Sequence, residues 1–183
     1  EKWEYSNTGY VLLASIVAQT SGMPFEKYLQ EQIFEPAKMS NTVVYNYISG
    51  SDSQMPNRVY GFSVGLNGTD LISSDSHYLN PAQGDGGIYS TLDDLLKWDR
   101  ILYDNVFISE ETKKEAFTPA ILNNGDTTSY GFGWFIDKSS TGKKVVRHGG
   151  RWVGFRAYIY REIEENNCII ILTNNPSRYL RSV

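Results

Sequence analysis

The side chain best suited to proton transfer lies at the end of an apolar run, where a histidine is followed by two glycines. His148-Gly149-Gly150 follows the β-rich residues Val145 and Val146, and histidine is the side chain that most readily exchanges protons near neutral pH. Glycine weakens a strand because it has no side chain to pack. Two adjacent glycines therefore suggest that another molecule approaches the backbone there. The alternative interpretation is a glycine-rich hairpin turn with a surface histidine.

Two serine motifs match known nucleophile patterns, but their surroundings do not favour that chemistry. Residues 61–65 read Gly-x-Ser-x-Gly, a pattern that needs a buried strand before Ser63 and a helix after it. Instead, a polar segment precedes it and Asn67-Gly68, a strong hairpin signal, follows it. Residues 140–143 read Ser-x-x-Lys, which works when one helical turn brings the lysine beside the serine. Because Ser140 lies among charged residues between two expected strands, we expect an exposed turn there.

A third candidate motif, which consists of Tyr5 and Asn7, lies near the start of the chain. A tyrosine hydroxyl can carry a proton, and an asparagine amide can orient a substrate carbonyl. On its own the spacing has no functional meaning, because a helix cap at Asn7 and a packed ring at Tyr5 explain it equally well.

Composition excludes several classes of protein. The chain has 183 residues, of which 40% are hydrophobic and 21% charged, so it is long enough for one folded domain and too apolar for a disordered segment. Its net charge of -4 gives no reason to expect nucleic acid as a partner. No apolar run is long enough to span a bilayer. The single cysteine, Cys168, excludes an internal disulfide and a cysteine-based metal site.

Helices are expected mainly in the first two thirds of the chain. Asn7 is a good N-cap and Gly22 a good C-terminal residue for a first helix, whose apolar spacing predicts a face in the core. Pro24 suits the first turn of a second helix that ends at about Phe34. Ser90 and Asp93 resemble a capping box for a third helix. The apolar stripe of the first helix comprises Leu12, Leu13, Ile16 and Val17, that of the second Tyr28, Leu29, Ile33 and Phe34, and that of the third Leu92, Leu95, Leu96 and Ile101.

A fourth, short helix is expected from Ser109 to about Phe117, and residues 40–83 between the second and third helices are polar and irregular. A short hairpin around Asn67-Gly68 is expected inside that irregular segment. Long irregular segments of this kind often form a wall or lid over a site.

Strands are expected after Pro119, with short polar connections that favour an antiparallel meander. The last of them, residues 168–172, shows no alternation and is expected to be buried on both faces. The order of the elements, with helices first and strands last, predicts an α+β fold. We expect one domain over 1–183, with a mainly helical part over 1–120 and antiparallel strands over 121–183. The strands cover residues 130–136, 144–148, 155–160 and 168–172.

Four short motifs together, in a fixed order, resemble a known family. They are Tyr5-Ser6-Asn7-Thr8-Gly9-Tyr10, Gly86-Gly87-Ile88-Tyr89-Ser90-Thr91, Tyr130-Gly131-Phe132-Gly133-Trp134, and His148-Gly149-Gly150 before Gly154-Phe155. The chain is similar from about Trp3 to Asn175 to the serine β-lactamase and penicillin-binding-protein-like family. The nearest branch is that of class C β-lactamases, D-alanyl-D-alanine carboxypeptidases and related esterases. The resemblance implies a β-lactamase/transpeptidase-like fold that is incomplete at its N-terminal side.

The resemblance also implies roles for individual residues. Tyr5 matches the tyrosine that helps to move the proton of the nucleophilic serine, and Asn7 matches the asparagine that contacts the substrate amide. His148-Gly149-Gly150 matches the Lys-Thr-Gly motif on the strand that lines the active site, with His148 in place of lysine and Gly149 in place of threonine. Arg151 falls where that strand offers a backbone N–H to the oxyanion.

The departures from the family are as informative as the matches. The family's nucleophile is a serine in a Ser-x-x-Lys motif on a helix well before Tyr-x-Asn, and no such helix precedes Tyr5. The family's closing C-terminal helix also appears only as a start at residues 179–181. Without the lysine, a tyrosine of ordinary pKa is about one part in a thousand ionised at pH 7. We therefore expect a fragment that is inactive alone. A histidine at 148, mostly neutral near pH 7, favours an esterase or D-amino-acid peptidase over a β-lactamase.

The resemblance implies that the parent protein is a serine hydrolase that forms an acyl-enzyme with a small-molecule or peptide substrate and needs no metal or organic cofactor. A periplasmic or extracellular location is implied in the same way. Two alternatives remain: a catalytically silent module that binds a peptide or peptidoglycan, and an unrelated hydrolase that uses Ser63. A half-domain exposes apolar surface, so a homo-oligomer is also expected.

Overall fold

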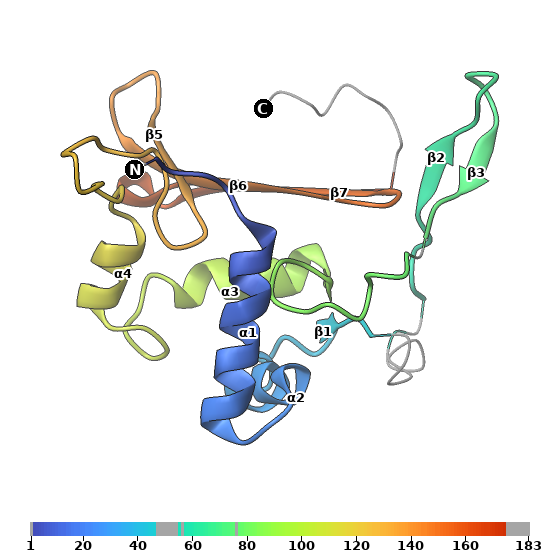
Figure 1. Cartoon of the computed structure of the whole chain (residues 1–183), viewed down its shortest axis with the longest axis horizontal. Helices are drawn as coiled ribbons and strands as arrows, with labels where there is room; N and C mark the ends of the chain where they lie inside the picture. Colours follow the sequence, from blue (N-terminus) through green and yellow to red (C-terminus); the bar gives the residue numbers. More distant parts are fainter. Residues whose placement is uncertain (1, 47–54, 56, 76, 175–183) are drawn as a thin grey trace.

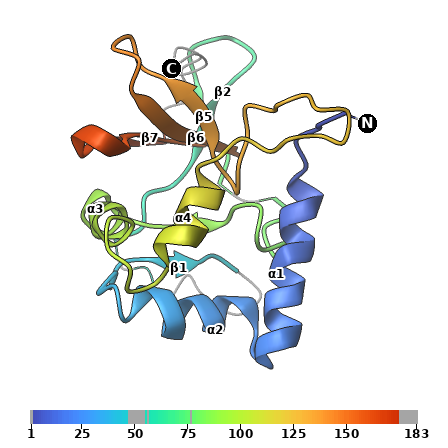
Figure 2. The same ribbon diagram turned by 90° about the vertical axis from the view of Figure 1, so that its left-hand side faces the viewer.

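The computed structural model describes residues 2–46, 55, 57–75 and 77–174, and the expected start of a helix at 179–181 lies outside them. A four-stranded sheet lies at one side of the molecule, α2 at the other, and α3 and α4 between them (Figures 1 and 2). The helices are α1 (Asn7–Ser21), α2 (Phe25–Leu29), the π-helix η1 (Gln30–Phe34), α3 (Leu92–Ile101), α4 (Glu110–Ala116) and the short 3-10 helix η4 (Ile163–Glu165). The strands are β1 (Val43–Val44), β2 (Phe62–Val64), β3 (Leu71–Ser73), β4 (Ile88–Tyr89), β5 (Phe135–Lys138), β6 (Lys144–Trp152), β7 (Phe155–Glu162) and β8 (Asn167–Thr173).

Helix α1 begins and ends almost where its capping residues predict. The N-cap is Ser6, one residue before the expected Asn7, and its hydroxyl accepts a hydrogen bond from the Gly9 N–H at 3.1 Å. Gly22 ends the helix in the left-handed conformation, with φ 70°. The prediction that the apolar face of α1 packs in the core is wrong. Only Ala14 is buried, whereas three of the predicted core residues are more than half exposed: Leu12, Leu13 and Ile16.

The second helix has the predicted bounds, and the last residue of its predicted apolar stripe is buried. Pro24 is the N-cap of α2, and η1 ends at Phe34, just before Glu35-Pro36. Phe34 is 5% exposed. The core cluster around it contains Ala37, Met39 and Val44, with Leu29, Ile33, Trp98, Ile101 and Phe107 packed against it.

The predicted α+β fold and antiparallel meander are confirmed, with strand order β5-β6-β7-β8. Two strand bounds differ from the predictions by more than two residues. The first strand starts at Phe135 rather than Tyr130, because residues 130–134 form a loop in which Gly133 has φ 79°. Strand β6 continues through Gly149 and Gly150 to Trp152, so the hairpin-turn interpretation of the two glycines is wrong. The domain bounds stay a prediction.

Strand β8 is half-exposed rather than buried on both faces. Three of its seven residues, Asn167, Ile169 and Leu172, are exposed and the others are half-buried. Ile169 is 55% exposed. Within the described residues β8 pairs only with β7, which makes it an edge strand, and α3 contacts it on one face. An apolar run in the sequence indicates burial by a whole layer on each face, whereas the described residues supply such a layer on one face of β8 only.

Helix α3 presents carboxylates to the interior, where the sequence pattern predicts leucines. Its N-cap is Thr91, whose hydroxyl accepts from the Asp94 N–H at 3.3 Å, so the expected capping box at Ser90 is shifted by one residue. Asp94 and Asp99 are buried, while Leu92 and Leu96 are nearly half-exposed. Asp94 Oδ2 accepts from the Asn41 N–H at 2.7 Å and from the Thr42 hydroxyl at 3.0 Å.

Helix α4 starts after its cap, Ser109, as expected. The hairpin predicted around Asn67-Gly68 is formed by β2 and β3, and it stands away from the body of the molecule (Figure 1). Its base packs backbone against backbone on the turn between β6 and β7: a Cβ added at Gly154 would lie 2.5 Å from the carbonyl carbon of Gly61. Glycine at both positions therefore permits this close approach.

Candidate functional site

One edge of β6 is open over the segment that carries most of the predicted site residues. Strand β5 pairs with β6 only as far as Phe135 opposite Arg147, whereas β7 continues along the other side to Trp152. Within the described residues, β6 therefore has a partner strand on one side only from His148 to Trp152. Residues 149–152 are all exposed. An extended chain of a substrate can form hydrogen bonds with such an edge, as an added strand does.

The two glycines on this edge have no internal packing reason to be glycine. A Cβ at Gly149 would lie 3.5 Å from a ring carbon of Tyr158, and one at Gly150 would lie 3.6 Å from the Cβ of Ala157, both ordinary contacts. Neither glycine has a positive φ. What glycine does here is leave the exposed edge without side chains, as the sequence interpretation of a close approach requires.

His148 is half-buried among aromatic rings. Its Nε2 lies 3.0 Å from the Tyr130 hydroxyl, and its ring stacks on Phe135 with a centroid distance of 5.6 Å. Burial lowers the pKa of His148 below its ordinary value, the Arg147 charge lowers it further, and a backbone hydrogen bond at Gly149 partly offsets both. The imidazole is therefore neutral at pH 7, as expected from the sequence, and it can donate or accept one proton in a hydrogen bond.

Tyr5 lies against the same cluster. Its ring centroid is 6.1 Å from that of His148 and 5.9 Å from that of Tyr130. Burial raises the pKa of Tyr5, and Tyr10 and the carboxylate of Asp85 raise it further. The structure thus brings Tyr5 and His148 together, but nothing in the described residues lowers the pKa of the phenol.

Asn7 and Arg151 are both exposed. Because Ser6 caps α1, the Asn7 side chain has no capping role, and it has no hydrogen-bond partner among the residues that the structure describes. Residues alternate between the faces of a strand, so the Arg151 side chain points to the face opposite that of His148. Only its backbone is then available at the open edge, which is the role that the sequence resemblance implied.

Tyr130 is a residue of the cluster that the sequence reasoning did not select. It is 6% exposed, and burial, followed by its neighbour Tyr10, raises its pKa. The signal was present, since Tyr130 begins one of the four ordered motifs, but we expected it inside a strand. In the structure its only strand-type pairing within the described residues is an isolated bridge with Phe135. Trp3 extends the cluster, with its ring 5.4 Å from that of Tyr130.

Neither serine motif has the geometry of a nucleophile. Ser63 lies in β2 opposite Ile72 and is followed by a turn and β3, where a nucleophile elbow needs a helix. Ser140 lies in the turn between β5 and β6, where the Gly142 N–H donates to the Ser139 carbonyl at 2.9 Å. The exposed turn predicted at Ser140 is confirmed.

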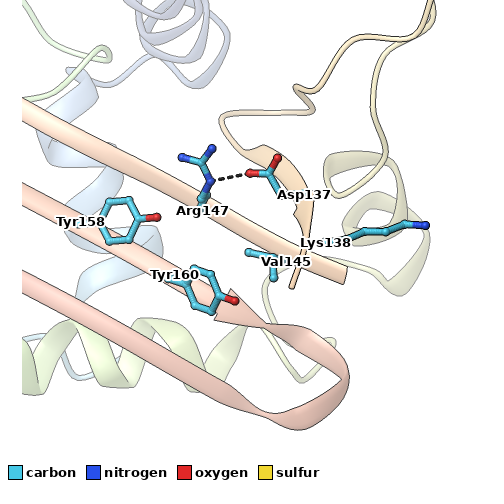
Figure 3. Close-up of a pocket in the computed structure, with 6 residues that line it drawn as sticks. All are labelled: Asp137, Lys138, Val145, Arg147, Tyr158 and Tyr160. Atoms are coloured by element: carbon cyan, nitrogen blue, oxygen red, sulfur yellow. Dashed lines mark hydrogen bonds and ion pairs between the residues drawn. The ribbon is translucent and has the colours of Figure 1, made fainter. Parts of the chain in front are cut away.

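A pocket of about 350 Å³ lies on the face of the sheet opposite that of His148 (Figure 3). In it Arg147 Nε donates to Asp137 Oδ2 at 2.5 Å, and the two side chains point toward each other. Arg147 precedes His148 in β6, so strand alternation separates this pocket from the cluster around His148. The lining residues are Asp137, Lys138, Val145, Arg147, Tyr158 and Tyr160.

The described part of the chain contains no group of three or more His, Cys, Asp or Glu side chains that could hold a metal ion. None of its helices has the length and apolar character needed to cross a bilayer.

Comparisons with known proteins agree on one family. The family model described as Beta-lactamase matches residues 1–181. Penicillin-binding protein 4* of Bacillus subtilis (strain 168) is 38% identical over 181 residues, which cover 95% of this chain and 40% of that protein. A D-aminopeptidase of Gluconobacter oxydans (strain 621H) is 23% identical over 175 residues, covering 96% of this chain and 32% of that enzyme. The chain thus spans less than half the length of these relatives.

Solved structures give the same result for the fold. The octameric penicillin-binding protein homologue from Pyrococcus abyssi matches with a TM-score of 0.79 and 27% identity, covering 96% of this chain and 39% of that one. The D-amino acid amidase from Ochrobactrum anthropi SV3, complexed with L-phenylalanine amide, matches with a TM-score of 0.76 and 25% identity. That match covers 96% of this chain and 50% of that one.

Proposed function

Because this chain belongs to the beta-lactamase family, we propose that it supplies the substrate-binding strand and part of the proton-transfer apparatus of a serine hydrolase that works through an acyl-enzyme. The substrate is an ester, a D-amino-acid peptide or a β-lactam. The observation that carries the proposal is the open edge of β6 from His148 to Trp152, with the Tyr5–His148–Tyr130 cluster at one end of it.

Each predicted residue has a role in this proposal. The substrate main chain pairs with the edge at Gly149 and Gly150, where no side chain obstructs it. The backbone N–H of Arg151 faces the oxyanion, and the Asn7 amide contacts the substrate amide. Tyr5 is the group that exchanges a proton with the nucleophile.

His148 sets the preference for substrate. A lysine in its place would carry a permanent charge suited to a substrate carboxylate, whereas the half-buried His148 is neutral at pH 7 because burial lowers its pKa. A neutral imidazole favours substrates without a carboxylate at that position. This supports an esterase or D-amino-acid peptidase over a β-lactamase.

The nucleophile lies outside these 183 residues in this proposal, and the chain alone has no acyl-transfer activity. Ser63 and Ser140 lie in a hairpin strand and in a turn. The pKa values of Tyr5 and Tyr130 are raised rather than lowered. A phenol becomes a useful base only when nearby cations lower its pKa, and that requires a cation from elsewhere in the protein.

A catalytically silent module that binds a peptide or peptidoglycan is the second candidate. The same raised tyrosine pKa values favour it, because the open strand edge binds an extended chain whether or not a proton is transferred.

Covalent labelling distinguishes the two candidates. The chain, and a polypeptide extended toward the N terminus by roughly one domain of 100–200 residues, are each treated with a fluorophosphonate and with a penicillin and read by intact mass. We expect an adduct on the extended polypeptide only. Absence of adduct from both favours the silent module. An adduct on the 183-residue chain would mean that Ser63 or Ser140 is reactive and would overturn the assignment.

Self-association is a further part of the proposal. Leu12, Leu13 and Ile16 are 60%, 53% and 53% exposed on one helix, and a contiguous apolar surface of this kind is typical of an interface. We expect a solution mass by light scattering that exceeds that of the monomer at high protein concentration. Charged substitution at Leu13 should reverse this. A mass that stays monomeric at all concentrations would contradict it.

A further inference from the structure

An aromatic group lies at the far end of the open edge, beyond Arg151. Trp152 is on the same face of β6 as His148 and Gly150, because alternate residues of a strand share a face. Its ring is 5.1 Å from that of His77 in an edge-on arrangement, and His77 in turn is 4.2 Å from the ring of Tyr78. We call these three residues, His77, Tyr78 and Trp152, the aromatic shelf.

Asn80 fixes the shelf in place. Its Oδ1 accepts from the Trp152 indole N–H at 2.7 Å and from the His77 N–H at 3.2 Å. The Asn80 N–H donates to the His77 carbonyl at 2.9 Å, which closes the turn on itself. A loop is thereby attached to β6 by a hydrogen bond between residues 72 positions apart in the chain.

Holding the shelf has a cost. Asn80 is 4% exposed, and its Nδ2 is buried without a partner among the described residues. A buried donor left unpaired lowers stability, and such groups persist where the arrangement serves a purpose. The purpose is not burial of the rings, since Tyr78 is 76% exposed and Trp152 is 38% exposed. Aromatic surface is therefore held rigidly at the open edge and left accessible.

The position of the shelf fixes which part of a ligand reaches it. The five residues from His148 to Trp152 span about 13 Å, because four steps of ~3.3 Å separate the first from the last, which is the length of a short peptide. In the proposed function the oxyanion lies at Arg151, and position 148 is where a substrate carboxylate would lie. Because the carboxylate of a peptide is at its C-terminal end, the leaving group lies toward His148. The acyl group of the substrate then extends past Arg151 toward Trp152.

We propose that the aromatic shelf binds the side chain of the acyl residue of the substrate, and that it selects an aromatic ring there. This rests on the proposed function, because the direction of the substrate along β6 comes from it. The polar tips of the shelf are already engaged or face solvent, so the ring faces of Tyr78 and Trp152 provide the contact. Aromatic pairs add about 0.5–1.5 kcal/mol beyond the area they bury, which corresponds to roughly 2- to 12-fold in affinity.

Binding to the 183-residue chain tests the proposal without any need for catalysis. The probes are N-acetyl-D-phenylalanine methylamide and N-acetyl-D-alanine methylamide, which share a main chain and differ by the phenyl ring. The readout is the indole N–H signal of Trp152 in a ¹⁵N-labelled chain, assigned by its loss in Trp152→Phe. We expect a saturable shift with both probes and a dissociation constant about tenfold lower for the aromatic one.

Two variants and the pattern of outcomes make the test decisive. Tyr78→Ala, at an exposed position that leaves the fold intact, should weaken the aromatic probe several-fold and leave the alanine probe unchanged. Leu66→Ala, which removes an exposed apolar side chain from the β2–β3 hairpin, should change neither. Equal affinity for both probes, or an unaffected Tyr78→Ala, would overturn the shelf and leave the proposed function standing. Absence of binding by either probe would overturn the shelf together with the substrate-binding role of β6.

Discussion

Replacing Asp99 by alanine removes the partner of an arginine that has no access to solvent. Arg161 is 0% exposed and Asp99 is 5% exposed, and Arg161 Nε donates to Asp99 Oδ1 at 2.5 Å. A second hydrogen bond runs from Arg161 Nη2 to the backbone carbonyl of Asp99 at 3.3 Å, and it survives the substitution. Nη1 already lacks a partner among the described residues. The variant therefore leaves a buried cation with one weak hydrogen bond.

The size of the loss follows from this geometry. Breaking a buried ion pair by removing one partner costs about 3–5 kcal/mol, because the remaining charge stays desolvated. The rings of Tyr103, Phe117 and Trp134 lie 4.7, 5.8 and 6.0 Å from the guanidinium carbon and continue to stabilise the charge. We therefore expect the lower end, about 3 kcal/mol. That is a large part of the ~5–15 kcal/mol by which a domain is stable.

Urea unfolding followed by circular dichroism measures this loss as a lower midpoint at unchanged slope. The matched control is Asp137→Ala, which breaks the half-exposed pair with Arg147 and should cost less than about 1 kcal/mol. The double replacement Asp99→Leu with Arg161→Met removes both charges and should recover most of the stability. A loss below about 1 kcal/mol in Asp99→Ala would refute the buried pair. A double variant as unstable as the single one would show that shape, not charge, determines the loss.

Three further predictions concern other parts of the molecule. The ring signals of His148 should titrate in NMR below pH ~6.5, because burial lowers its pKa. The contribution of His148 to stability is complete above that pH and is lost as the pH falls through the lowered pKa. A titration midpoint at the ordinary pKa of histidine would contradict this. Gly154→Ala should lower the free energy of unfolding by about 1–3 kcal/mol and expose the β2–β3 hairpin to proteolysis, because a Cβ at this position would collide with the hairpin backbone. In the control Gly86→Ala, the added Cβ meets no atom within 4 Å, so stability should not change. Asp94→Ala should lower the free energy of unfolding by about 1–3 kcal/mol because it leaves buried donors unsatisfied; exposed Asp93→Ala is the control, and equal losses in the two would contradict the buried network.

Local signals in the sequence predicted the elements, and contacts between distant segments decided where the predictions were wrong. The ends of α1 and α4 follow from capping residues that lie next to them, and these were correct within one residue. The buried face of α3 was wrong because its carboxylates are satisfied by Thr42 and Arg161, which lie 52 and 62 positions away. A leucine pattern cannot reveal such partners, and isolated carboxylates are rarely buried without them.

In the candidate site, too, local motifs identified some residues, and a residue positioned by a tertiary contact was missed. Tyr5, Asn7 and His148 were selected from short motifs, and the ring contact between Tyr5 and His148 is consistent with that selection. Tyr130 was missed because its place depends on a loop whose close packing is tertiary. A Cβ at Gly131 in that loop would collide with the backbone carbonyl of Ala116 in α4, a contact that no local pattern indicates.

The open edge of β6 imposes a handedness on any extended ligand that pairs with it. Ladder hydrogen bonds fix the direction and register of the partner main chain, so each α-carbon of the ligand has one substituent on either face of the sheet. Inverting that carbon exchanges the two substituents. One enantiomer then directs its side chain to the face of His148 and Trp152, and its mirror image directs the side chain to the face of Arg147 and Tyr158. Chiral discrimination follows from main-chain pairing alone, without a cavity shaped around the asymmetric carbon.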